Sequence, residues 1–457
     1  MGVGDVSKRI LVGRKLRSSQ VGETLLPKRI ALPVFASDAL SSVAYAPDEV
    51  FIMLSLAGAS AYVWSWKIGI AVALVMTAVV ASYRQNVHAY PSGGGDYEVA
   101  TVNLGRTAGT TVASALLVDY VLTVAVSISS GAQYAASAVP VLSGHEATVA
   151  SIAVLVLMAM NLRGIKESGT FFAIPTYAFM AAMGVMIGYG FLRMLGGTLP
   201  DVASADLSIE AGPGYESGLT TLGLMFLLAR AFSSGCAALT GVEAISNGVP
   251  AFRKPKSRNA ASTLFLLALI AITMMMSVIV LANQMGLKYV DPHELERLRL
   301  PSGAPVPAGY DQDTVIAQIA RAVFSDFSPG FYLVVTVTGV ILVLAANTAF
   351  NGFPVLGSIL AEDGMAPRAL GSRGDRLAYS NGIVFLAVMA IALILAFDAE
   401  TTRLIQLYIV GVFVSFTLSQ IGMVRHWNRL LKNVRDAAVR RRMRHSRVIN
   451  VIGLTMT

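Results

Sequence analysis

Three acidic residues, Asp38, Asp119 and Glu243, lie inside long apolar stretches of this sequence. One acid at the centre of a membrane span costs roughly 2.5–3.5 kcal/mol. Three acids would cost on the order of 8–10 kcal/mol, which is comparable to the net stability of a domain. Such a cost persists only where the carboxylates face water, a cation or one another. We therefore predict a functional role for all three acids. The alternative is a purely structural role, in which each acid caps or hydrogen-bonds free N–H groups.

A stripe of polar residues follows from Asp119 in the stretch TTVASALLVDYVLTVAVSISSGAQYAA. Thr123, Ser127, Ser130 and Tyr134 follow at spacings of 4, 4, 3 and 4, so all five residues share one helical face. The pattern predicts a stripe that faces the protein interior. The serines and the threonine could alternatively serve only helix–helix packing through small polar contacts.

Carboxylates, hydroxyls and free carbonyls are hard oxygen ligands, and they suit alkali cations better than transition metals. Dense negative charge disfavours an anionic substrate. A free amino acid also presents a carboxylate, which would require helix N-termini and glycine amides rather than Asp38. One of the acids could carry a proton and couple its movement to that of a cation; the sequence does not show which one.

Composition indicates a polytopic membrane protein. Of 457 residues, 55% are hydrophobic and 14% are charged, against about 25% charged residues in a typical soluble domain. Mean hydropathy is +0.64, and runs of about 20 apolar residues can cross a bilayer. The predicted spans are ten, at roughly 30–56, 63–88, 108–138, 146–161, 170–195, 219–249, 260–285, 330–351, 382–397 and 402–424, with a partial one from about 448.

The net charge of +8 is distributed over alternate loops, which argues against nucleic-acid binding and sets the orientation. Basic residues concentrate in the N-terminus and the even-numbered loops, which predicts a cytoplasmic N-terminus in a multi-pass cell-membrane protein. The loop 286–325 is mixed in charge, and we interpret it as an outer cover with a short helix, DTVIAQIARAVF, or alternatively as a gate.

The last residues, VINVIGLTMT, resemble the start of a truncated eleventh span, since a helix that stops halfway would leave backbone groups unsatisfied in lipid. A fragment is favoured over a tail at the membrane interface.

Two interrupted segments indicate an internal repeat. FASDALSSVAYAPD begins at residue 35 and FSSGCAALTGVEAISNGV at residue 232, which is 197 positions later. Both lie mid-span, are rich in small residues and contain an acid. One such segment per half is typical of inverted-repeat transporters with broken first and sixth helices. The predicted organisation is a basic N-terminus (1–28), a first five-helix repeat (29–200), a second one (215–424) and a basic C-terminal segment with the start of the eleventh span (425–457).

Other chemistry is excluded by what the sequence lacks. The single cysteine, Cys236, excludes an intrachain disulfide and a cysteine-based metal site. The sequence has no catalytic triad, zinc motif or Walker sequence. It therefore predicts neither an enzyme nor a cofactor.

Several stretches together resemble the KimA-type potassium importers, relatives of the Kup potassium uptake family in the amino acid–polyamine–organocation superfamily. They are FASDALSSVAYAPDEV, YPSGGGDYEVA, LLVDYVLTVAVSISSG, LTGVEAISNGVPAF, RLAYSNGI and LYIVGVFVSFTLSQIGMVRHW, and the resemblance covers about 20–430. It implies high-affinity, proton-coupled potassium uptake on an all-α LeuT-type 5+5 inverted-repeat fold.

The resemblance also implies the residues of the potassium pathway, with Glu243 and Asp38 as candidates for proton coupling. The pathway residues are Asp38 and Tyr45 in the first helix, Asp119, Tyr120, Thr123 and Ser127 in the third, Thr240 in the sixth and Tyr408 in the tenth.

Members of that family continue through twelve spans into a cytoplasmic domain linked to homodimer formation and cyclic di-AMP inhibition. The present chain ends at Thr457, so the resemblance leaves both properties open for it.

The main alternative function is an amino acid or amine permease of the same superfamily, although the first span lacks the G-[ST]-G break that receives a carboxylate. A non-transporting sensor or a channel-like protein is the third hypothesis.

Overall fold

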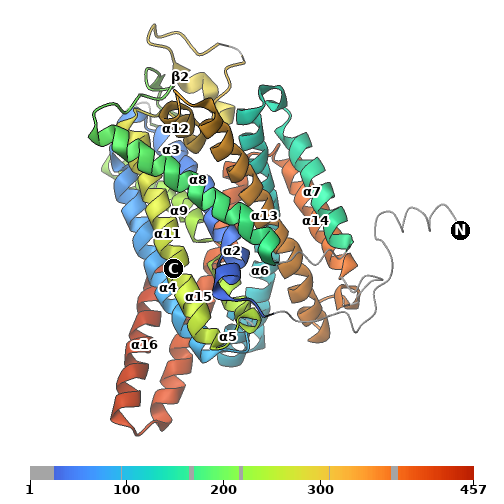
Figure 1. Ribbon diagram of the computed structural model, residues 1–457. Helices are drawn as coiled ribbons and strands as arrows, with labels where there is room; N and C mark the ends of the chain where they lie inside the picture. The colour runs from blue at the N-terminus through green and yellow to red at the C-terminus, as the bar shows by residue number, and fades with distance from the viewer. Residues whose placement is uncertain (1–24, 94, 164–168, 216–219, 308, 372–378) are drawn as a thin grey trace, which may run out of the picture.

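The computed structural model describes residues 25–457 except 94, 164–168, 216–219, 308 and 372–378. Most of the basic N-terminal segment predicted at 1–28 therefore lies outside the described residues. Long helices lie side by side in one bundle (Figure 1). The helices are α2 (Lys28–Ser41), α3 (Ala46–Ser55), α4 (Ser65–Ala89), α5 (Gly95–Leu104), α6 (Arg106–Ala138), α7 (Glu146–Leu162), α8 (Gly169–Leu195), α9 (Thr221–Gly235), α10 (Val242–Asn247), α11 (Lys256–Gln284), α12 (Val315–Val323), α13 (Ser328–Glu362), α14 (Ser380–Ala396), α15 (Thr401–Asn433) and α16 (Ala437–Met456).

The helices agree with a protein that crosses the membrane many times. Eight helical segments within the described residues are long and apolar enough to span a bilayer, and α7 and α14 are shorter apolar helices. Together they coincide with the ten predicted spans. The protein is therefore an all-α polytopic membrane protein, as the sequence predicted.

The first span is interrupted between α2 and α3, where the short helix η2 (Ser42–Ala44) intervenes. The hydroxyls of Ser41 and Ser42 donate to the main-chain carbonyl of Asp38, at 2.6 and 3.2 Å. Such side-chain bonds compete with the helical ladder. Pro47 stands in the first turn of α3 and has no N–H to continue that ladder. The predicted break in this span is confirmed.

The second interruption separates α9 from α10 and contains the short helix η5 (Cys236–Leu239). Thr240 is extended and Gly241 is left-handed, with φ of +78°. A Cβ on Gly241 would lie 2.6 Å from the main-chain nitrogen of Ala39. Glycine therefore supplies both the left-handed turn and the room for the two breaks to touch.

Helices at matching positions in the two halves pack against each other. The second span, α4, lies on α11, and the third, α6, lies on α13. The fourth, α7, lies on α14, and α3 of the first span lies on α9 of the sixth. The pairing joins the two halves of the chain, and their description as two inverted five-helix repeats stays a prediction.

One end of the bundle, at the top of Figure 1, is covered by the loops 196–215 and 286–325. Two short strands, β1 (Ser208–Ile209) and β2 (Leu298–Arg299), join these loops as an antiparallel pair. The helix predicted in the second loop is present as α12, and the hydroxyl of Thr314 caps it by accepting from Ala317 N–H at 3.4 Å. One face of α12 is buried against α13, α11 and α8, as expected for a cover on the bundle.

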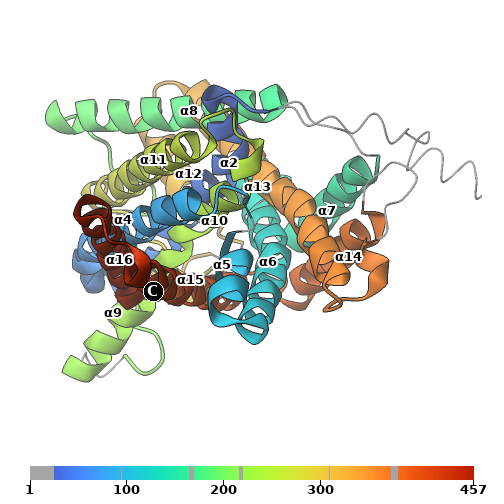
Figure 2. The same ribbon diagram turned by 90° about the horizontal axis from the view of Figure 1, so that it is seen from below.

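The opposite end carries α5, the end of α15 and α16, as seen from below in Figure 2. The residues predicted to begin an eleventh span form the second half of α16, which packs on α15 and α4. Asp436 caps α16 by accepting from two main-chain N–H groups, at 2.8 and 3.0 Å. Among the described helices, α16 is not one of those long and apolar enough to span a bilayer. The eleventh span stays a prediction.

We expect Gly241→Ala to destabilise the protein more than Gly144→Ala. Both glycines are left-handed, so each substitution brings about 1–2 kcal/mol of backbone strain. Only at Gly241 does the added Cβ also meet backbone, because nothing lies within 4 Å of the corresponding position at Gly144. Thermal unfolding of the purified protein measures the difference, and equal Tm losses in the two variants would contradict a close contact between the breaks.

Candidate functional site

Hydroxyl groups from both helix breaks meet at the centre of the bundle. Ser42 Oγ lies 2.6 Å from Thr240 Oγ1 and 3.0 Å from the Tyr45 hydroxyl. Tyr45 and Thr240 are themselves 3.5 Å apart, and all three side chains are buried. Thr240 also donates to the carbonyl of Ala237, at 2.9 Å. The cluster of Ser42, Tyr45 and Thr240 therefore ties the first break to the second.

Two acids flank this hydroxyl cluster, one from each break. The Asp38 carboxyl lies against Gly241, where an added Cβ would come within 2.9 Å of it. Glu243 lies in the first turn of α10, where the backbone N–H groups of the helix N-terminus favour negative charge. Both acids are buried, and Asp38 Oδ1 and Glu243 Oε2 have no hydrogen-bond partner in the part of the chain that the structure describes.

The polar stripe of α6 approaches from a third side. The structure buries all five of its residues. Thr123 Oγ1 lies 2.9 Å from the Tyr408 hydroxyl of α15, and Tyr134 donates to the carbonyl of Ala44 in the first break at 2.9 Å. Asp119 Oδ1 and Ser127 Oγ have no partner within the described ranges. Asp119 is close enough to Glu243 and Asp38 for their charges to interact.

Tyr120 is placed apart from the hydroxyl cluster. It follows Asp119 on α6 and so points about 100° away around the helix. Its ring packs against Gly352 of α13, where an added Cβ would lie 2.7 Å from the ring. The structure therefore brings Asp38, Tyr45, Thr240 and Glu243 to the breaks and sets the α6 stripe beside them. Tyr120 lies between Gly352 of α13 and Asn247 of α10.

Sequence reasoning missed a fourth acid, Asp96 of α5. It is buried, and its Oδ2 accepts hydrogen bonds from Tyr83 at 2.5 Å and Ser415 at 2.9 Å. Its charge also interacts with that of Asp119. The run YPSGGGDYEVA predicts a sharp turn, and nothing in it marks Asp96 as buried.

A cavity of about 320 Å³ leads from the loop-covered end of the bundle to the first break. Tyr45 lines this cavity and also belongs to the hydroxyl cluster. Glu49 accepts from Thr402 at 2.7 Å through Oε1, whereas Glu49 Oε2 and Asp48 Oδ1 have no partner among the residues described. The acids that line the cavity are Asp48, Glu49, Glu146, Asp311, Asp398 and Glu400.

The mouth of this cavity lies outside the spans. Partial burial raises the pKa of Asp311 and that of Glu400 above the usual carboxyl range. Asp48 and Glu49 lie deeper, directly after Pro47, and the sequence prediction overlooked them because they border the apolar run VFIML. The cavity is thus an acidic vestibule above the hydroxyl cluster.

Carboxylates and hydroxyls make up this site. Main-chain carbonyls that have no helical hydrogen bond at the breaks lie nearby. Such oxygen donors suit a hard cation. Broken helices that meet in this way are typical of secondary transporters.

The comparisons agree with that class. The family model described as amino acid permease matches residues 34–447, so the chain belongs to this family. The chain is also 43% identical over 423 residues to the potassium transporter KimA of Bacillus subtilis (strain 168), which confirms the resemblance noted in the sequence. The match covers 92% of this chain and 64% of that protein, so the chain spans less than two thirds of its relative's length.

We expect the Thr123–Tyr408 contact to be measurable by a double-mutant cycle. Thr123→Val leaves the buried Tyr408 hydroxyl unpaired, which costs about 1–3 kcal/mol. Tyr408→Phe made in the same chain should recover part of that loss, because no unpaired hydroxyl then remains. Thermal unfolding of the purified variants gives the coupling, and strictly additive losses would show that the contact does not exist.

A matched control is Thr77→Val, since Thr77 is on α4 and bonds only to the carbonyl of Ala73 in its own helix. Its unfolding free energy should change by no more than about 0.5 kcal/mol.

Proposed function

We propose that this protein is a secondary active transporter that imports potassium and couples the import to proton symport. The observation that carries the proposal is the meeting of two helix breaks around hydroxyls and carboxylates with unpartnered oxygens. The relative named for potassium transport supports the choice of ion. Potassium sites replace the hydration shell of the ion with oxygen ligands, and this site offers such ligands from three helices.

The acidic vestibule is the proposed entrance. Low-dielectric walls that carry one sign of charge raise the local concentration of the opposite ion. Potassium collects at Glu49 and Asp48 and then passes Tyr45, the residue shared by the vestibule and the hydroxyl cluster. Asp38, Thr240 and the Asp119–Thr123–Ser127 face of α6 receive it below. Tyr120 lies next to Asp119 and close to Asn247 of α10, and it stays part of the proposed pathway.

Proton coupling follows from the closeness of the acids. Asp38, Asp119 and Glu243 are all buried around the two breaks, where ionising all three is unfavourable unless positive charge offsets them. Either potassium or a proton can supply that charge. Glu243 and Asp38 are the proposed proton carriers because each sits at a helix break, where it can be exposed when the halves of the helix move.

The proposed orientation places the N-terminus in the cytoplasm and the vestibule outside the cell membrane. It rests on the basic residues of the even-numbered loops and of α16, since positive charge marks the cytoplasmic face.

A second candidate, an amino acid or amine permease, is favoured by the description of the matching family. The acids at the breaks would accept an amine. They would repel the carboxylate of an amino acid, which in this class is received by helix N-termini.

We expect Asp119→Asn to lower rubidium uptake at least about tenfold, because a buried charged contact contributes roughly 1.5–3 kcal/mol. Growth rescue of a strain without potassium importers should be lost in potassium-limited medium. Asp326→Asn is the matched control, since this acid is exposed at the covered end, where it pairs with Arg193 at 3.6 Å. Full rescue by Asp119→Asn would remove this residue from the pathway.

We expect proteoliposomes to take up rubidium and not labelled amino acids or amines, with proton entry in parallel. An internal pH dye measures the proton flux. Amine uptake without rubidium uptake would establish the permease alternative, and rubidium uptake without proton flux would indicate a channel.

A further inference from the structure

Three potential metal ligands meet at the mouth of the acidic vestibule, at the outer end of the proposed potassium pathway. Ligand atoms of Asp291, His293 and Glu400 all lie within 4.8 Å of one another. Asp291 caps the short helix η7 (Pro292–Arg297) and accepts from the main-chain N–H of His293 at 3.0 Å. Glu400 immediately precedes α15. The cluster therefore joins the outer loop 286–325 to the tenth span.

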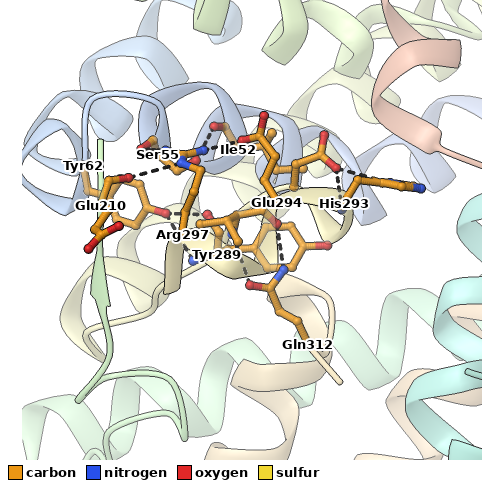
Figure 3. A network of polar contacts seen from close by, with 11 residues as sticks. Ile52, Ser55, Tyr62, Glu210, Tyr289, His293, Glu294, Arg297 and Gln312 are labelled. Carbon is orange, nitrogen blue, oxygen red and sulfur yellow. Dashed lines mark hydrogen bonds and ion pairs between the residues drawn. The ribbon is translucent and has the colours of Figure 1, made fainter. Parts of the chain in front are cut away.

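The loop side of the cluster is held in place by the network shown in Figure 3. Arg297 of η7 is buried and donates to the carbonyls of Ser55 and Glu210. Gln312 bonds to the main chain of Val290 in both directions, at 2.7 and 3.1 Å. Because these contacts flank Asp291 and His293 in the sequence, the two side chains are presented from a fixed backbone over the end of α3.

The α15 side is held by a tight turn. Asp398 and Ala399 are left-handed, with φ of 49° and 56°, and Glu400 N–H donates to the carbonyl of Phe397 at 2.8 Å. Arg403 binds Glu400 Oε2 at 2.8 Å. The Glu400 side chain is thereby oriented into the vestibule, which it lines together with His293.

A second observation points to a cation at this place. Glu49 is 1% exposed, lines the same vestibule, and its Oε2 has no hydrogen-bond partner within the described ranges. Glu400, His293 and Thr401 line this vestibule together with Glu49. The buried hydroxyl of Thr401, next to Glu400, is likewise unpartnered among the described residues. Two unpartnered oxygen atoms thus belong to residues that line the same cavity as His293 and Glu400.

We propose that Asp291, His293 and Glu400 bind a divalent transition-metal ion of the zinc class at the vestibule mouth. An imidazole with two carboxylates is a usual zinc ligand set, whereas calcium and magnesium take oxygen ligands alone. Tetrahedral zinc at about 2.0–2.2 Å from each ligand needs ligand atoms roughly 3.4 Å apart, and the ligand atoms here lie within 4.8 Å of one another. Water or Glu49 can take the fourth position.

The bound ion ties the outer loop to the start of α15 across the vestibule. It also places positive charge where potassium collects under the proposed function. Zinc at the outer face therefore slows transport, whereas the binding itself does not depend on what the protein transports.

Zinc binding to the purified full chain, prepared without a polyhistidine tag, tests the site. Calorimetry should find one zinc ion per chain and no calcium at this site. His293→Ala and Glu400→Gln should each weaken zinc binding at least about tenfold, since even outer-shell changes cost 10–100-fold in metal affinity. His445→Ala is the matched control, because His445 is exposed on α16 at the opposite end of the bundle.

Thermal unfolding separates ligand loss from misfolding. Zinc should raise the Tm of the wild-type protein, because a ligand bound only to the folded state stabilises it. His293→Ala should show the wild-type Tm without zinc and no rise with it, and His293→Cys should recover the rise. Equal zinc affinity in wild type and His293→Ala, or no binding by wild type, would overturn the site whatever the outcome of the rubidium experiments.

Discussion

The contact between the two helix breaks is the constraint on which the rest of this structure depends. Gly241 lies against the backbone of Ala39, and Ser42 meets Thr240 at 2.6 Å. Without a side chain at Gly241, two interrupted helices from opposite halves of the chain approach closely enough to share one polar centre. The packing of α4 on α11 and of α6 on α13 is consistent with the same pairing of halves. Acids that would be costly in lipid thereby become enclosed by protein.

In this arrangement the acidic residues lie at three depths below the loop-covered end of the bundle. Acids at the mouth of the vestibule are partly exposed, and Glu49 and Asp48 form a buried tier below them. Asp38, Glu243 and Asp119 make the deepest tier, beyond the hydroxyl cluster that includes Tyr45. Irregular backbone is tolerated at membrane depth only where it is buried in protein or lines a cavity, and both breaks satisfy this condition. A cation that moves inward would meet carboxylate oxygens in each tier.

The sequence predicted most of the fold and part of the site, for identifiable reasons. Span positions follow from apolar runs, and the breaks follow from Pro47, Gly241 and small polar residues within such runs. The α6 stripe follows from helical spacing alone. Asp96 was missed because a Gly-rich turn gives no sign that the next helix folds back into the bundle. Tyr120 was grouped with Asp119 through a resemblance to known importers, and its role in the pathway stays a prediction.

The sequence by itself determined that the chain crosses a membrane many times, where its two halves are interrupted, and which acids require compensation. These properties are local, because they depend on the composition and period of single segments. Only the tertiary structure decided which polar groups meet. Ser42 and Thr240 are 198 positions apart, and His293 approaches Glu400 from a different loop. Contacts of this kind depend on the packing of whole helices, and no period within one segment encodes them.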